Sequence, residues 1–410
     1  YVPGYKFMPA YRTRMWDGKI RLFSQKTKEI YFGLYPYIKA FAEERGYNIV
    51  AGKDIDIDNK VDKDVVTKFS NSLGQKFEAR DYQIDAIYHS LKRNRALLVS
   101  PTASGKSFII YSLIRYYSHL IKKESNNRIL LIVPTTSLVE QMYKDFEDYG
   151  YDSEQYCHRQ YSGKDKHTNK FLTITTWQSI YKNPGEYFEQ FDFVLGDEAH
   201  QFKAKSLTTI LSGCVNAKYR IGTTGTLDGT QTHKLVLEGL FGPVYKATST
   251  TDLIDKGQLA SFKIKCLILK HPESVCKMAR SWDYNQELEY IVMNTARNNF
   301  IRNLALSLNG NTLILFQFVE KHGKSLHANI KEHAKNRHVF FVFGGTDVEI
   351  RESVRAITEK ERDAIIVASY GTFSTGVNIR NLHNIIFASP SKSRIRNLQS
   401  IGRGLGIGEN

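Results

Sequence analysis

Two short runs of residues carry the types and spacing that hydrolysis of a nucleoside triphosphate requires. The first is the run SPTASGKS, from Ser100 to Ser107. Backbone N–H groups of such a loop can converge on the β- and γ-phosphates, while Lys106 neutralises phosphate charge and Ser107 offers its hydroxyl to Mg²⁺. Ser100 stands where the pattern usually has glycine, so we interpret the loop as a variant. The residues expected to bind ATP here are Thr102, Ala103, Ser104, Gly105, Lys106 and Ser107.

The second run is the acidic DEAH sequence Asp197-Glu198-Ala199-His200. Asp197 would hold Mg²⁺ through water, and Glu198 would orient or deprotonate the water that attacks the γ-phosphate. The alternative is a surface acidic turn with an incidental histidine. A phosphate loop in the same chain, and a strand pattern directly before the acids, favour the catalytic interpretation.

Short apolar segments predict the elements that position both runs. Arg95–Val99 and Phe191–Leu195 are typical of buried parallel strands, and Phe108–Leu120 has helical spacing. Strands and helices alternate over residues 73–258, which predicts a parallel sheet with helices on both faces. The pattern repeats from residue 259 without a phosphate loop. Its expected strands are Lys263–Leu269, Leu313–Phe316, Val339–Phe343, Ala364–Ala368 and Asn384–Ala388, with a helix at Tyr284–Met293.

Further segments follow in the order of a known family. Lys106, Asp197, Glu198 and His200 sit in the order of the superfamily 2 helicases, which the chain resembles over residues 73–410. The other segments that carry the likeness are Arg80–Gln83, Val133–Leu138 with Gln141, Thr173–Ser179, Thr224–Thr226, Leu313–Phe316 with Phe318, Gly344–Thr346, Thr372–Asn378 and Gln399–Arg403.

The resemblance implies two RecA-like domains in tandem and ATP-driven movement along nucleic acid. It assigns adenine contacts to Arg80 and Gln83, and further γ-phosphate contacts to Gln399 and Arg403. The coupling of hydrolysis to strand binding falls to His200, Thr224 and Thr226. The strand backbone would be held by Thr135, Thr176, Gln178, Thr372 and Ser374.

Within this superfamily the chain is most similar to the phage UvsW-type helicases. The likeness rests on Trp16–Leu22, Ala368–Gly376 and Asn381–His383. It implies remodelling of branched DNA (forks and Holliday junctions) and of RNA–DNA hybrids in recombination, repair and replication restart. It also implies a monomer in the cytoplasm of the host cell.

The last motif departs from the family pattern. The family has a second arginine three residues after the position of Arg403, where this chain has Gly406. An arginine that reaches the γ-phosphate can be worth about 10³ or more in rate. Either Arg403 suffices, or the chain is a slowed, even engineered, variant.

Composition agrees with a nucleic-acid motor. The chain has 410 residues, a net charge of +15 and a sequence pI near 9.4, which indicates a polyanionic partner; an ordinary basic protein is the alternative. The four cysteines lack paired ligand spacing, so neither a zinc site nor a disulfide framework is expected. No apolar run approaches the length of a membrane span. The start at Tyr1 and the stop after the last motif suggest a fragment.

The N-terminal residues have a different character. Residues 1–40 hold eight Lys or Arg, two acids and ten aromatics. Asp17-Gly18 is a strong hairpin turn, and its closure would place Arg12, Arg14, Trp16, Lys19 and Arg21 with Phe23 on one face that could bind nucleic acid. Thr13, Met15, Ile20 and Leu22 would form an apolar face. The alternative is a solvated basic face with Trp16 packed on the motor. Phe32–Tyr47 is expected to be helical.

The expected organisation is thus three α/β domains: a small basic domain at 1–72, a RecA-like domain with the ATP site at 73–258, and a second RecA-like domain at 259–410 that is C-terminally incomplete. Two rival functions use the same folds. One is an ATP-gated nucleic-acid clamp or annealing protein; the other is a double-stranded DNA translocase that does not separate strands.

Overall fold

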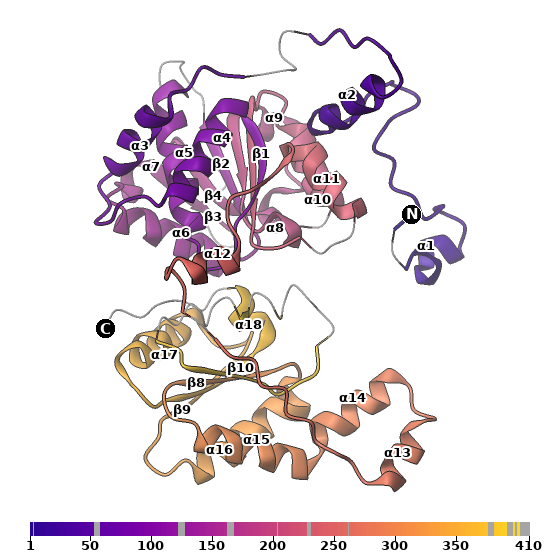
Figure 1. Cartoon of the computed structure of the whole chain (residues 1–410), viewed down its shortest axis with the longest axis vertical. Coiled ribbons are helices and arrows are strands. Elements are labelled where there is room, and N and C mark those ends of the chain that lie inside the picture. The colour runs from indigo at the N-terminus through magenta and orange to yellow at the C-terminus, as the bar shows by residue number, and fades with distance from the viewer. Residues whose placement is uncertain are drawn as a thin grey trace. The chain divides into compact units, whose positions relative to one another are not determined.

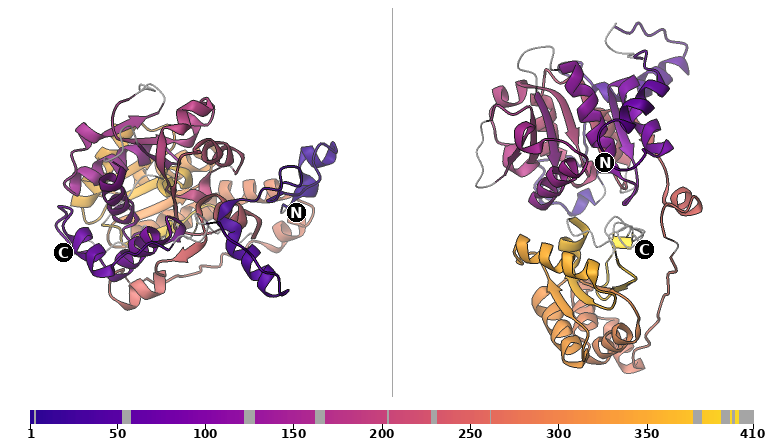
Figure 2. Two further views of the ribbon diagram at one scale, coloured as in Figure 1. Left: turned by 90° about the horizontal axis from the view of Figure 1, so that it is seen from above. Right: turned by 90° about the vertical axis from the view of Figure 1, so that its left-hand side faces the viewer.

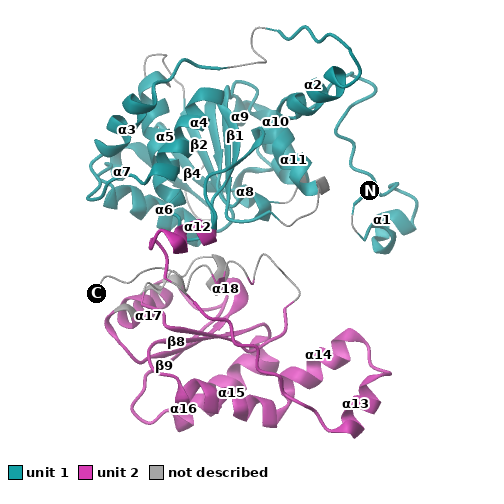
Figure 3. Ribbon diagram, in the orientation of Figure 1, with its two compact units in different colours: residues 1–249 teal, residues 250–410 magenta. Residues whose placement is uncertain are grey.

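The computed structural model of the chain divides into two compact units, residues 1–249 and 250–410 (Figure 3). It describes residues 1–2, 4–52, 58–121, 128–161, 168–202, 204–227, 231–260, 262–375, 381–391, 397 and 400–401. Each unit contains its own parallel sheet, as the repeated strand pattern predicts.

The described part of unit 1 is built on a sheet of seven parallel strands (Figure 1). Their spatial order is β3-β4-β2-β5-β6-β1-β7. The bounds are β1 (Arg95–Val99), β2 (Arg128–Val133), β3 (Cys157–Gln160), β4 (Leu172–Thr176), β5 (Phe191–Gly196), β6 (Tyr219–Thr224) and β7 (Val244–Lys246). Most residues of the central strands β2, β5, β6 and β1 are buried, because helices cover both faces of the sheet.

Helices on the two faces bury separate cores. One core joins α3 (Lys63–Asn71), α4 (Asp81–Arg93), α5 (Lys106–Ile121) and α6 (Thr136–Asp148) to the sheet. The other joins α8 (Trp177–Ile180), α9 (Gly185–Glu189), α10 (Ala204–Gly213) and α11 (Gln231–Phe241). The remaining elements are η1 (Tyr5–Phe7), α1 (Pro9–Arg12), η2 (Phe32–Leu34), α2 (Tyr35–Glu43), α7 (Ser153–Tyr156) and η3 (Ala199–Gln201).

The N-terminal segment is tied to this unit at α11. The Tyr37 hydroxyl donates to Glu238 at 2.7 Å, and burial with this contact raises the pKa of Tyr37 to about 12. Gly33 lies so close to the Glu238 carbonyl that a Cβ would come within 1.8 Å of its oxygen. The Arg95 guanidinium lies over the Phe32 ring at 4.4 Å. Residues 31–37 therefore anchor the segment before them to α11 and β1 of unit 1.

The hairpin predicted around Asp17-Gly18 does not form, so this prediction is wrong. Pro9 begins α1, so Arg12 is helical, and Arg14 has a positive φ of 57°. The Tyr5 ring covers Gly18, and Val2 N–H donates to the Gly18 carbonyl at 2.8 Å. The turn at Asp17-Gly18 therefore packs against Val2 and Tyr5 instead of joining two strands.

The prediction of an apolar face on that hairpin is also wrong, because the Met15 side chain is 83% exposed and that of Ile20 is 41% exposed. An antiparallel bridge forms instead between Phe23 and Ile30. The helix predicted at Phe32–Tyr47 forms as η2 followed directly by α2, and it is shorter than predicted because α2 ends at Glu43.

Unit 2 has a parallel sheet of four described strands in the order β11-β8-β10-β9. The strands are β8 (Thr312–Phe316), β9 (Val339–Val342), β10 (Ile365–Ser369) and β11 (Asn384–Phe387). The helical elements are α12 (Thr250–Asp255), α13 (Glu273–Ala279), α14 (Tyr284–Met293), α15 (Thr295–Ser307), the π-helical turn η4 (Val319–Gly323), α16 (Lys324–His333), α17 (Val348–Lys360) and α18 (Tyr370–Thr375).

The strand predicted at Lys263–Leu269 does not form. Residues 262–272 run as extended chain with neither helix nor strand (Figure 2). Ile264, Leu267 and Ile268 are more than half exposed. The alternating pattern is present, but no described strand pairs with this segment. No helix among the described residues is long and apolar enough to cross a membrane.

Candidate active site: a phosphate loop joined to an acidic pair

The phosphate loop leaves the carboxyl end of β1 and enters α5. Ala103 and Gly105 both have positive φ, 64° and 76°. At Gly105 a Cβ would lie 2.4 Å from Gln83 Nε2, so this position requires glycine for both conformation and space. Ser100 takes part in the fold of the loop, since its hydroxyl lies 2.6 Å from that of Ser104. This contact explains how a serine can occupy the usual glycine position.

Two residues at the start of α4 donate hydrogen bonds to backbone carbonyls of the phosphate loop. Tyr82 donates its hydroxyl to the Ser104 carbonyl at 2.6 Å. Gln83 Nε2 donates to the carbonyls of Ser104 and Gly105 at 3.1 and 3.4 Å, and Gln83 Oε1 accepts from Arg80 N–H at 2.9 Å. Gln83 is 3% exposed, so in this conformation its amide holds the loop. The adenine contacts of Arg80 and Gln83 stay a prediction.

Lys106 and Glu198 meet directly. Lys106 Nζ lies 2.9 Å from Glu198 Oε1, with side-chain exposures of 11% and 15%. Glu198 has a positive φ of 49°, a conformation that costs about 1–3 kcal/mol in a non-glycine residue. Burial alone would raise the pKa of Glu198, but Lys106 and His200 hold that pKa below its ordinary value. The carboxylate is therefore ionised and paired with Lys106.

Asp197 directly follows β5 and precedes Glu198 in the chain. Its Oδ1 accepts from the Thr223 hydroxyl at 2.6 Å and from Glu198 N–H at 2.8 Å. Burial, together with the neighbouring Glu198 charge, raises the pKa of Asp197 to about 6. A cation beside this carboxylate would relieve both effects. Thr223 precedes the predicted coupling residues by one position, and sequence reasoning missed it.

The coupling residues reach the acidic pair through short contacts. His200 Nδ1 lies 2.6 Å from the Thr224 hydroxyl, which donates to the Thr226 carbonyl at 2.8 Å. The Thr226 carbonyl can only accept, so the Thr224 hydroxyl uses its single proton there. His200 must therefore donate to the Thr224 oxygen, and its Nδ1 carries the proton. Gly225 N–H donates to Glu198 Oε2 at 3.4 Å. The two Glu198 oxygens thus join the phosphate loop to the segment after β6.

Three of the predicted strand-binding residues lie together in unit 1. Thr135 lies two residues after β2 and Thr176 is the last residue of β4. The two strands pair in parallel with Val133 opposite Thr176. The Gln178 amide donates to the Pro134 carbonyl at 3.3 Å, and the Thr176 hydroxyl bonds to that of Ser179 at 2.8 Å. The carboxyl ends of adjacent strands therefore place these polar groups at one edge of the sheet.

The predicted residues of unit 2 are less fully described. The Thr372 hydroxyl is bonded to that of Ser369 at 2.8 Å, and Thr372 is only 6% exposed. The side chain of Ser374, and the whole of Gln399, Arg403 and Gly406, lie outside the described residues. Their roles stay predictions.

Four of the five predicted N-terminal residues line one cavity of about 700 Å³. These are Arg12, Arg14, Trp16 and Arg21, and the cavity is completed by Lys6, Tyr11, Met15 and Asp17. Arg21 is paired with Asp17 at 2.6 Å. Lys19 lies elsewhere, over the Tyr1 ring at 4.9 Å. The basic and aromatic residues gather as predicted, but through α1 and the following turn.

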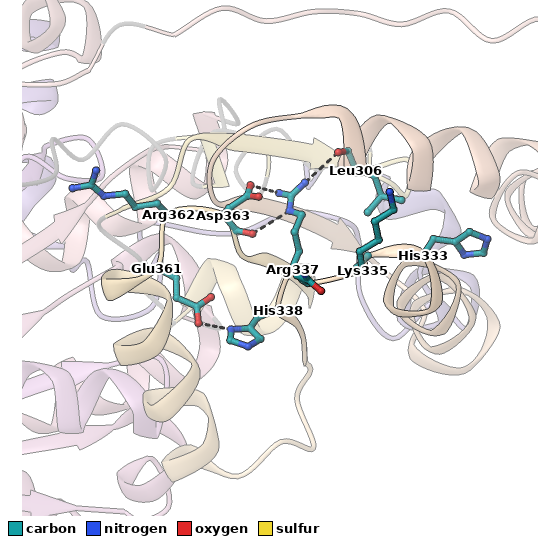
Figure 4. Close-up of a pocket in the computed structure, with 10 residues that line it drawn as sticks. Leu306, His333, Lys335, Arg337, His338, Glu361, Arg362 and Asp363 are labelled. Atoms are coloured by element: carbon teal, nitrogen blue, oxygen red, sulfur yellow. Dashed lines mark hydrogen bonds and ion pairs between the residues drawn. The ribbon is translucent and has the colours of Figure 1, made fainter.

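A second cavity, of about 750 Å³, lies in unit 2 at the amino ends of β9 and β10. Figure 4 shows Arg337 directed toward Asp363, at 2.9 Å, and toward the Leu306 carbonyl, at 3.3 Å. These contacts tie the end of α15 to the sheet. Ligands of parallel sheets bind at the carboxyl ends of the strands, so we interpret this cavity as structural.

Comparisons with known proteins agree with this geometry. The sequence profile of the family "Type III restriction enzyme, res subunit" matches residues 76–229, and that of "DNA helicase UvsW, N-terminal" matches residues 1–52. The ATP-dependent DNA helicase uvsW of Enterobacteria phage T4 is 34% identical over 98% of this chain and 81% of its own length.

Solved structures give the same result. The crystal structure of T4 UvsW aligns with 98% of this chain and 80% of its own, at 32% identity and a TM-score of 0.55. The DUF1998 helicase MrfA bound to DNA and AMPPNP aligns with 87% of this chain and 49% of its own, at 14% identity and a TM-score of 0.58, and supports the fold alone.

A phosphate loop and an acidic pair on one of two RecA-like sheets define a superfamily 2 helicase, an enzyme driven by ATP hydrolysis. Within that class the chain belongs to the UvsW family of ATP-dependent DNA helicases.

Proposed function

We propose that the protein is an ATP- and Mg²⁺-dependent helicase that remodels branched DNA. The substrates would be forks, Holliday junctions and R-loops with their RNA–DNA hybrids, in recombination, repair and replication restart. The observation that carries the proposal is the double role of Glu198. Its carboxylate contacts both Lys106 of the phosphate loop and the backbone N–H of Gly225, which lies between the predicted coupling residues Thr224 and Thr226.

Ser107 and Asp197 fit the role of holding Mg²⁺. Asp197 is buried, its pKa is raised, and only Oδ1 has hydrogen-bond partners among the described residues. Mg²⁺ is usually held by one or two protein side chains together with the phosphates of the substrate. When bound, Mg²⁺ would neutralise charge on the β- and γ-phosphates.

Hydrolysis would begin with an exchange of partners. The γ-phosphate takes Lys106 from Glu198, and the freed carboxylate orients the attacking water. Gln399 and Arg403 would contact the γ-phosphate from the second domain. Loss of that phosphate would release the second domain, and the grip of Thr135, Thr176, Gln178, Thr372 and Ser374 on the strand backbone would shift. His200, Thr224 and Thr226 would report the nucleotide state to that grip.

The N-terminal cavity supports branched DNA as the partner. Arg12, Arg14 and Lys6 have no ion-pair partner among the described residues, and aromatic rings beside unpaired cations suit an unstacked base and its phosphate. Residues 31–37, which follow this cavity in the chain, contact α11 and β1 of the first RecA-like domain. We also propose the domain division 1–72, 73–258 and 259–410, a monomeric enzyme and, as for a phage-type helicase, a place in the host cell cytoplasm.

Three measurements test the proposal. Steady-state ATP turnover with and without DNA separates a helicase from an ATP-gated clamp or annealing protein, which would not need fast turnover. Strand displacement on forks, four-way junctions and R-loops, compared with linear duplex of equal length, tests the branched substrate. Displacement of a triplex without strand separation would instead identify a duplex translocase. Equal rates on linear and branched DNA would contradict the proposed substrate.

A further inference from the structure

The hydroxyl of Ser107 has a partner that the known motifs do not include. Ser107 Oγ lies 2.8 Å from the hydroxyl of Tyr149, a residue 42 positions further along the chain. Tyr149 ends α6 as its C-cap. The aromatic residue therefore contacts the same hydroxyl that we assign to Mg²⁺.

The position of Tyr149 does not depend on the phosphate loop. Its ring packs edge-on against Phe77 and Phe108, with centroids 5.9 and 5.6 Å away. The Tyr149 carbonyl oxygen accepts a hydrogen bond from the Tyr111 hydroxyl at 3.4 Å. A Cβ added to Gly74 would lie 3.1 Å from the same oxygen, so the backbone of Gly74 packs closely against it. The phenol is thus presented to Ser107 by a packed aromatic cluster.

A serine hydroxyl has one proton to donate and two lone pairs. If one lone pair contacts a cation, the O–H bond is polarised and the hydroxyl becomes a stronger donor. Tyr149 is placed to accept that hydrogen bond. The contact would then direct a lone pair of Ser107 toward the cation, and would be stronger with the cation than without it.

Helix α6 gives this contact a second consequence. Its N-cap is Thr135, which we assign to strand binding, and the Thr135 side chain accepts from Leu138 N–H. The helix of 13 residues spans about 20 Å. A displacement of its first turn by a bound strand would therefore be carried to Tyr149 at the other end.

We propose that Tyr149 is a positioning residue of the ATP site, which holds the Ser107 hydroxyl for Mg²⁺ and transmits strand binding at Thr135 through α6. This inference rests on the proposed function, since that assigns Ser107 and Thr135. Tyr149 would act through Ser107 and α6 and not by contact with the phosphates or the strand.

The first experiment is a Mg²⁺ titration of the binding of a fluorescent, non-hydrolysable ATP analogue. Tyr149→Phe keeps the packed ring and removes the hydroxyl. We expect the Mg²⁺ concentration at half-saturation to rise about fivefold, the range of one net hydrogen bond, and binding in EDTA to stay unchanged. Tyr151→Phe is the matched control, because Tyr151 lies in the same cluster without contacting Ser107. An unchanged Mg²⁺ midpoint in Tyr149→Phe overturns the proposal.

Ser107→Ala separates this inference from the proposed function. If it leaves the Mg²⁺ midpoint at the wild-type value, Ser107 is not a metal ligand and the proposed function is wrong at this point. If Ser107→Ala shifts the midpoint and Tyr149→Phe does not, only the role of Tyr149 fails.

The second experiment measures how single-stranded DNA changes the affinity for the same analogue. We expect a severalfold tightening in the wild type that is reduced in Tyr149→Phe, since reciprocal coupling requires the α6 contact. Full coupling in the variant would refute the role of α6, whereas no coupling in the wild type would refute the motor mechanism itself.

Discussion

Lys106 and Glu198 form an ion pair with 2.9 Å between Nζ and Oε1, so each neutralises the charge of the other. In the proposed mechanism both groups are needed elsewhere during hydrolysis, Lys106 on phosphate and Glu198 on water. The phosphate of ATP would then have to break the ion pair before the water could be activated. ATP binding and the release of the Glu198 carboxylate would thus be a single event, because the lysine cannot serve both partners equally.

Replacing Glu198 by glutamine separates binding from hydrolysis. The amide cannot form the ion pair and is a poor base, so we expect ATP binding to be equal or tighter. DNA-stimulated turnover should fall by about 10²-fold or more. Equilibrium binding of a fluorescent ATP analogue and steady-state turnover check the two effects. Lys106→Ala is the comparison, and it should lose both properties. Turnover of Glu198→Gln within about twofold of the wild type would contradict the assigned role.

The N-terminal cavity should contribute to binding of forked DNA. Arg12→Ala with Arg14→Ala removes two cations that have no ion-pair partner among the described residues, so fork affinity should fall and the salt dependence should flatten. The slope of log K against log salt is expected to drop by about 1.5, since each phosphate contact contributes about 0.7–0.9. Basal turnover should stay unchanged.

The matched control for this pair is Lys26→Ala with Lys68→Ala, which removes the same charge from exposed positions outside the cavity. Fork titrations at several salt concentrations measure the effect. Equal slopes in the two double variants would show that only the net charge matters, and the cavity would then be structural.

His322 should make the stability of unit 2 depend on pH. It is fully buried, with Nε2 3.1 Å from Asn298 Oδ1 and Nδ1 2.9 Å from the Ser389 hydroxyl. The amide oxygen can only accept, so Nε2 carries the single proton. Burial, with a smaller contribution from Arg297, lowers the pKa of His322 from 6.5 to about 4.

Because the pKa is lower in the folded state, the unfolded chain binds more protons between these two values. The stabilising contribution is therefore complete above about pH 6.5 and is lost as the pH falls toward 4, by about 3 kcal/mol in total. Urea midpoints from pH 8 to pH 4.5 measure the loss. His322→Gln should be less stable at pH 8 but should show a shallower decline, and parallel curves would contradict the assignment.

Many local elements could be predicted from the sequence, because strand–loop–helix units depend on residues close together in the chain. The strand predicted at Arg95–Val99 agrees with β1, and the helix at Tyr284–Met293 agrees with α14. Apolar runs of this kind are buried whatever the rest of the chain does. Contacts between distant segments could not be predicted in this way. The bond between Ser107 and Tyr149 depends on how α5 and α6 pack side by side, which no local pattern encodes.

The errors have the same origin. Asp17-Gly18 has the local preference for a hairpin, yet Gly18 is used for the close approach of Tyr5. The alternating segment Lys263–Leu269 could form a strand only with a partner, and no described strand pairs with it. Local propensity is therefore overruled wherever the element needs a partner from elsewhere in the chain.

The last prediction concerns Gly406, which stands where the family has an arginine. Both Arg403 and Gly406 lie outside the described residues, so the expectation rests on the sequence. One guanidinium would leave the developing charge on the γ-phosphate with fewer donors than two. Binding of ATP should be unaffected, because the phosphate loop lies in the first domain. Gly406→Arg should therefore raise DNA-stimulated turnover about tenfold with little change in nucleotide affinity. Gly404→Ala serves as a control for change in this segment. If Gly406→Arg is folded by circular dichroism and its turnover is unchanged, then Arg403 suffices and glycine at this position is a neutral variation.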